Sequence, residues 1–112
     1  MKEIKAYIRP NRLDKVIRDL EQAGVPGITI VEVHPVGHGF EPNYFSRARE
    51  EIKRFFEIVK LEIVCHDEQV ERFIQIILEN TSTGSPGDGR IFLSPVEEAI
   101  RIRDGERGNS IL

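Results

Sequence analysis

The sequence contains a single cysteine, Cys65, so no disulfide can form within the chain. No apolar run approaches the ~18 residues of a membrane-spanning helix, and the start lacks the long apolar segment of a secretory signal peptide. We therefore expect a cytoplasmic protein that is not itself embedded in a membrane. The formal net charge is −3. This argues against a nucleic-acid partner, because such proteins carry a basic face.

The signatures of common enzyme classes are also missing. The chain has neither a G-x-S-x-G elbow nor an H-E-x-x-H helix. Its paired acidic residues have simpler explanations, with Asp67 and Glu68 at the start of a predicted helix and Glu50 and Glu51 in a charged loop. No nucleophile stands beside a recognisable base, so we predict that the protein is not an enzyme.

The 112 residues are enough for one small domain. Alternating apolar residues predict strands at residues 2–9, 28–33, 55–64 and 91–93. Helical spacing predicts one helix from Asn11, as its N-cap, to about residue 23, and a second helix capped by Asp67. A capping box at residues 94–97 predicts a further short helix, and residues 101–103 are expected to be extended. The order β-α-β-β-α-β is typical of the α+β, ferredoxin-like fold.

The two long helices should each bury one apolar stripe. The stripes are Leu13, Val16, Ile17 and Leu20 in the first helix, and Val70, Phe73, Ile74, Ile77 and Leu78 in the second. Between the second and third strands lies a long polar and aromatic segment, residues 37–54. Segments of this length in small domains are usually functional or mobile.

A glycine-rich loop, residues 83–90, precedes the last predicted strand. Gly84 and Gly89 have the spacing of a P-loop, but the next residues are Arg90 and Ile91 rather than Lys followed by Ser or Thr. A P-loop also opens a helix, whereas this loop opens a strand. Bare N–H groups and Arg90 could still bind an anion. The alternative is an ordinary turn between a helix and a strand.

Two further arginines, Arg101 and Arg103, are two residues apart in a segment expected to be extended, so they should point the same way. Together with Arg90 they could clamp a polyphosphate. The alternative is a pair of solvated arginines beside Glu97 and Glu98.

The motif T-G-x-x-G-D-G-R-I-F at residues 83–92, followed by I-R-I-R-D-G-E-R-G at residues 100–108, resembles the PII (GlnB-type) signalling proteins. The opening strand and residues 27–33 resemble the same family, so the similarity covers essentially the whole chain. The resemblance implies a homotrimer with its sheets facing the centre and ATP or ADP bound in the clefts between subunits, with Mg²⁺ as an additional candidate. The nucleotide-binding positions that it implies are Thr29, Gly37, Gly87, Asp88, Gly89, Arg90, Arg101 and Arg103.

The segment 37–54 corresponds to the loop with which PII proteins dock on a regulated transporter or enzyme, and here it departs from the family pattern. Gly39 stands where the family has a glutamine that helps to hold magnesium and 2-oxoglutarate, which argues against 2-oxoglutarate sensing. Glu51 replaces the tyrosine that some members have uridylylated, which excludes that modification here. Ile58 replaces a lysine found in many members, although Lys60 is kept. These changes suggest an unusual target protein.

Three other functions remain open. His34, His38, Cys65 and His66 are residue types that bind zinc or copper, but their spacing matches no metal motif. Surface histidines and a small buried cysteine explain them better. A small trimeric metal-binding protein similar to CutA is nevertheless an alternative, as is a divergent PII-like sensor of AMP or ADP together with a small anion such as bicarbonate. A structural trimer that has lost its ligand is a third.

Overall fold

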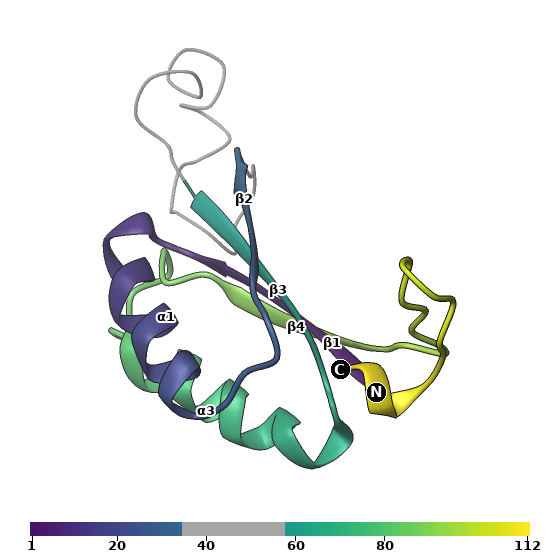
Figure 1. The fold of residues 1–112 in the computed structure, drawn as a ribbon. Coiled ribbons are helices and arrows are strands. Elements are labelled where there is room, and N and C mark those ends of the chain that lie inside the picture. Colours follow the sequence, from purple (N-terminus) through teal and green to yellow (C-terminus); the bar gives the residue numbers. More distant parts are fainter. Residues whose placement is uncertain (35–57) are drawn as a thin grey trace.

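The computed structural model describes residues 1–34 and 58–112. The proposed docking loop, residues 37–54, lies outside the described residues, and so do Gly37, His38, Gly39 and Glu51. The described part contains the strands β1 (Lys2–Ile8), β2 (Thr29–Val33), β3 (Ile58–Cys65) and β4 (Arg90–Pro95), and the helices α1 (Leu13–Gln22) and α3 (Val70–Thr81). The strands form one antiparallel sheet in the order β2-β3-β1-β4, and both helices lie on the same face of it (Figure 1).

Strand β1 is central because it pairs with β3 on one side and β4 on the other. Its alternation sends Ile4, Ala6 and Ile8 into the core, each no more than 2% exposed, as predicted. The matching side of β3 buries Leu61, Ile63 and Cys65 beneath the helices. The ferredoxin-like arrangement expected from the element order is therefore confirmed.

The helices begin differently from the prediction. Pro10 opens a 3-10 turn with Arg9 as its N-cap, and α1 follows at Leu13, so Asn11 is not the cap. Residues before proline favour extended backbone, which suits an N-cap. Asp67 is not the cap of the second helix either, because it lies inside a 3-10 turn that starts after His66. Its carboxylate is 3.0 Å from the amino group of Met1.

The buried stripe of α1 contains Val16 and Leu20, in agreement with the expected spacing. The stripe of α3 is rotated slightly from the prediction. Ile76 is buried while Leu78 is 45% exposed, although Phe73 and Ile77 are buried as expected. Leu78 therefore faces a surface cavity beside β4 instead of the core.

Two predicted elements near the C-terminus are wrong. Residues 94–97 do not form a helix, because Ser94 and Pro95 extend β4 along β1, where Pro95 is the register partner of Lys2. Proline is acceptable there since β4 is an edge strand. Residues 101–103 are not extended. They belong to a turn closed by the bridge between Ile100 and Arg107, which projects from the end of the sheet (Figure 1).

Candidate functional site

The glycine-rich loop is held in one shape by the carboxylate of Asp88. The backbone N–H groups of Thr83 and Gly84 donate to Asp88 Oδ2 at 2.6 and 3.0 Å, and the Thr83 hydroxyl donates to Oδ1. The hydrogen bond from the Thr83 hydroxyl is the main reason that the pKa of Asp88 is lowered. In this chain Asp88 therefore organises the loop from within.

Arg9 fastens the same loop to the end of β1. Its Nε donates to the carbonyl oxygen of Gly87 at 2.9 Å, and its Nη2 donates to the hydroxyl of Ser85 at 3.3 Å. The two partners lie 78 and 76 residues further along the chain. Sequence reasoning missed Arg9, since no local pattern could reveal contacts across such a separation.

Gly89 brings the loop into direct contact with β1. Its φ is +110°, and a Cβ added there would lie 1.8 Å from the carbonyl oxygen of Tyr7. Only glycine fits this position, because both the backbone angle and the space exclude a side chain. The loop therefore reaches β4 along a path fixed by Asp88, Arg9 and Gly89.

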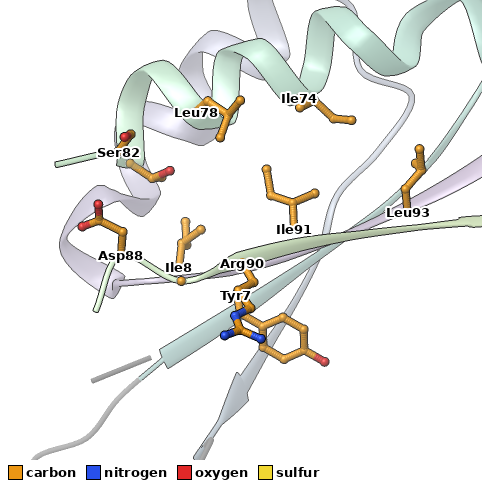
Figure 2. A pocket seen from close by; sticks show the side chains of 11 residues that line it. Tyr7, Ile8, Ile74, Leu78, Ser82, Asp88, Arg90, Ile91 and Leu93 are labelled. Carbon is orange, nitrogen blue, oxygen red and sulfur yellow. The ribbon is translucent and has the colours of Figure 1, made fainter. Parts of the chain in front are cut away.

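Arg90 follows at the start of β4 as the register partner of Tyr7. Both side chains lie on the open face of the sheet, away from the helices, whereas Ile91 points the other way (Figure 2). Further along the same face, Phe92 is 50% exposed and meets Tyr7 edge to face, with 5.9 Å between ring centroids. A cation and two aromatic rings are thus presented together on this face.

A cavity of about 450 Å³ lies on the helix side, between α3 and β4. Ile74 and Leu78 line it from α3, and Ile91 and Leu93 line it from β4, while Asp88 stands at one end (Figure 2). The cavity is mostly apolar, and the glycine loop forms its rim.

A second cavity, of about 350 Å³, lies over the open face of the sheet, where β2, β3 and β1 adjoin the C-terminal residues. Thr29 lines it from β2, and Glu62 and Val64 line it from β3, with Glu3 and the C-terminal Leu112 nearby. Its polar groups are the carboxylates of Glu3 and Glu62 and the hydroxyl of Thr29, and Val64 adds an apolar side chain. Of the predicted site residues within the described ranges, Thr29 is the one that lines this cavity.

The predicted site residues that the structure describes do not converge within one chain. Thr29 is on β2 and Arg90 is on β4, the two edge strands of the sheet. Three strand spacings, roughly 14 Å in total, therefore separate β2 from β4. The C-terminal arginines follow β4, whose six residues carry the chain roughly 20 Å away from Arg90. A clamp formed by Arg90, Arg101 and Arg103 of the same chain is therefore ruled out by the fold.

Arg101 is engaged inside its own turn. Its Nε and Nη2 donate to the two carboxylate oxygens of Asp104 at 3.0 and 2.7 Å, and Nη2 also donates to Glu106. The side chain of Arg103 is 77% exposed, and its Nε is 4.0 Å from Asp104. Arg101 and Arg103 thus differ in availability, and their partners are not Glu97 and Glu98. Glu98 pairs with Arg107 at 2.9 Å.

The metal candidates that the structure describes do not come together, because His34 lies apart from Cys65 and His66. His34 follows β2, and His66 follows the opposite end of the paired strand β3, so the two are separated by about the length of that strand. Cys65 is completely buried, as predicted, and burial raises the pKa of its thiol. Within residues 1–34 and 58–112, no group of three or more His, Cys, Asp or Glu side chains is arranged to hold a metal ion.

The family model described as nitrogen regulatory protein P-II matches residues 1–106 of the chain. The chain belongs to this family. Relatives named nitrogen regulatory protein P-II include those of Azospirillum brasilense, 41% identical over 100% of both chains, and Bradyrhizobium diazoefficiens, 45% identical over 96% of both chains. The relative of that name from Haemophilus influenzae is 42% identical over the full length of both.

Membership of the P-II family settles the broad class of activity. P-II proteins are regulatory signalling proteins and not enzymes, in agreement with the prediction from the sequence. In the part of the chain that the structure describes, no helix is long and apolar enough to cross a membrane.

Proposed function

We propose that this P-II protein binds an adenine nucleotide, ATP or ADP, in clefts between the subunits of a homotrimer, and that the bound state controls a target protein through residues 37–54. The observation that carries the proposal is the division of the site into two halves on one chain. The ordered glycine loop and Arg90 lie at the β4 edge, and the cavity around Thr29 lies near the β2 edge. Each half is incomplete alone, and a neighbouring copy would supply the other.

The chemistry of the two halves suits different parts of a nucleotide. Arg90 and the loop backbone are suited to the phosphates, because a guanidinium and bare N–H groups both donate to anionic oxygens. Around Thr29, the carboxylate of Glu62 can accept hydrogen bonds from sugar hydroxyls, and Val64 offers an apolar surface for a base. Arg103, which is largely exposed, is available to a ligand held by the next subunit.

The open face of the sheet supports assembly. Phe92 is half exposed there, next to Tyr7, and Lys5 forms an ion pair with Glu3 on the same face. Burying the part of this face around Phe92 and Tyr7 between copies would remove apolar surface from water and keep this ion pair. We infer that this face lies at the centre of the trimer.

Control of the target requires that the nucleotide bind two states of the protein with different affinity. Residues 37–54 are the proposed contact with that target, either a transporter or an enzyme. If ATP and ADP select different states, they should give different patterns of protease cleavage within these residues. Identical patterns with ATP, ADP and no ligand would contradict this form of control.

The decisive experiment is isothermal titration calorimetry with ATP, ADP and AMP, with and without Mg²⁺, combined with the molar mass of the protein from light scattering. We expect micromolar nucleotide binding to a trimer, and weaker binding by Arg90→Ala and Thr29→Val. Arg72→Ala, which removes an exposed arginine on α3, is the matched control and should bind normally. Failure of all three nucleotides to bind would refute the proposal. Titrations with 2-oxoglutarate, for which we expect no added heat, and with bicarbonate and Zn²⁺ would test the other candidate ligands.

A further inference from the structure

The turn formed by residues 101–106 carries two arginines but also two carboxylates, Asp104 and Glu106, so its formal charge is zero. The carboxylates are not spread over the turn, because both bind the same guanidinium, that of Arg101. The contact with Asp104 is bidentate, because Nε donates to one carboxylate oxygen and Nη2 donates to the other. Arg101 is therefore already neutralised within its own chain.

Backbone hydrogen bonds make this arrangement a stable part of the turn. The N–H of Arg101 donates to the carbonyl oxygen of Glu106 at 2.8 Å, and the N–H of Gly105 donates to the carbonyl oxygen of Arg101 at 2.7 Å. The N–H of Glu106 also donates to Asp104 Oδ1 at 3.0 Å. Gly105 has a φ of +72°, which allows the chain to reverse at this point. The backbone thus presents both carboxylates to Arg101.

A phosphate and a carboxylate accept hydrogen bonds from the same N–H groups of an arginine guanidinium, so they compete for it. A phosphate that approaches Arg101 must displace Asp104 or Glu106, or else tolerate their negative charge. Arg103 lacks such a close partner, with Asp104 at 4.0 Å and most of its side chain in solvent. The penalty for approaching the turn should grow with the charge of the ligand, because the Coulomb energy scales with that charge.

We propose that Asp104 and Glu106 are specificity-determining residues that reduce the preference of this protein for ATP over AMP. The proposal rests on the nucleotide site proposed above, and it assigns to Arg103, not Arg101, the first contact with the phosphates. Because Asp104 and Glu106 neutralise Arg101, this arginine no longer acts as a cation that would favour the more highly charged ligand. Discrimination among the three nucleotides should therefore be weak in the natural protein and stronger once the carboxylates are neutral.

The test is to measure Kd for ATP, ADP and AMP with the full chain and with the double variant Asp104→Asn, Glu106→Gln. Asparagine keeps an oxygen that can accept the bond from the N–H of Glu106, so the turn should persist. We expect the ratio of Kd for AMP to Kd for ATP to rise about three- to tenfold. The Kd for AMP itself should change by less than about twofold.

The matched control is Glu98→Gln, which removes one negative charge from the same region but frees Arg107 instead of Arg101. The single variant Asp104→Asn is measured alongside it, and Glu98→Gln should change the ratio less than Asp104→Asn does. Glu106→Gln alone leaves the bidentate contact of Asp104 in place, and should give an intermediate ratio even if the double variant folds poorly. Circular dichroism would verify folding of each variant.

The outcomes separate this inference from the proposed function. If the natural protein binds nucleotides but the ratio is unchanged or falls in the variants, the role of Asp104 and Glu106 is wrong and the nucleotide site stands. If neither the natural protein nor any variant binds a nucleotide, both proposals are overturned. An equal effect of Glu98→Gln would show that only the overall charge of the region matters, which would also overturn the specific role of these two residues.

Discussion

Replacing Gly89 by alanine should be the most damaging single-methyl change in the glycine-rich loop, residues 83–90. The added Cβ would lie 1.8 Å from the carbonyl oxygen of Tyr7 and 3.0 Å from its carbonyl carbon. These are backbone atoms of β1, which is paired on both sides, so they cannot move without disturbing β3 or β4. The φ of +110° adds strain of its own, because residues with a Cβ avoid this region.

The expected cost follows from these two effects. Forcing a methyl group into occupied space typically costs about 1–3 kcal/mol, and holding a non-glycine residue in such a backbone conformation costs about 1–3 kcal/mol. Together they predict a loss of about 2–6 kcal/mol in the free energy of unfolding. For a domain of this size, that corresponds to a decrease in Tm of roughly 10–25 °C.

Gly84→Ala is the matched control in the same loop. Gly84 also has a positive φ, +84°, but nothing lies within 4 Å of the Cβ position, so only the backbone strain applies, about 1–2 kcal/mol. Thermal unfolding followed by circular dichroism, at one fixed protein concentration, compares the two variants. If Gly89→Ala lowers Tm no more than Gly84→Ala does, the reasoning from the contact with Tyr7 is refuted.

Three further predictions concern the loop and the core. Arg9→Ala should weaken ATP binding about three- to tenfold, because it removes the hydrogen bonds that hold Gly87 and Ser85. These bonds are partly exposed, so Tm should fall only slightly. Calorimetry would measure the affinity, and an unchanged affinity would contradict this prediction. Because the folded pKa of Asp88 is lowered, its contribution to loop order is complete above the ordinary aspartate pKa of 3.8 and is lost as the pH falls through the lower folded value. NMR shifts of the amides that donate to it should therefore move below pH 3.8, not above it. Cys65, fully buried with a raised pKa, should react with a thiol reagent at pH 8 far more slowly in the folded protein than in denaturant; equal rates would argue against this burial.

Local sequence patterns predicted the parts of the fold that depend on one-sided burial. The alternation in β1 places Ile4, Ala6 and Ile8 in the core, and the spacing in α1 buries Val16 and Leu20. These patterns are reliable because each strand or helix has one face against the same core. The glycine loop was also recognised from its residues, although its purpose as a close contact with β1 was not.

Tertiary pairing explains where the prediction failed. Residues 94–97 carry a good helix-start signal, but the free edge of β1 offers hydrogen bonds to Ser94 and Pro95 as part of a strand, and the N–H of Val96 continues the pairing at Met1 with a bond of 3.1 Å. The spacing of Arg101 and Arg103 likewise gave no sign of the turn, because its stability comes from Asp104 and Glu106 acting across it. A local signal is overridden when a more distant segment satisfies the same backbone groups.

The division of the site over two sheet edges has a consequence for how ligand and assembly depend on each other. If one copy supplies Arg90 and the next supplies Thr29, a bound nucleotide contacts both and stabilises only the assembled form. By linkage, the nucleotide must then strengthen the association of subunits by the same free energy by which association strengthens nucleotide binding. On this proposal a single subunit supplies half of each of two clefts, so no local motif in this chain would describe a complete site. The arginines that looked like one clamp in the sequence belong, on this view, to two different clefts of the same trimer.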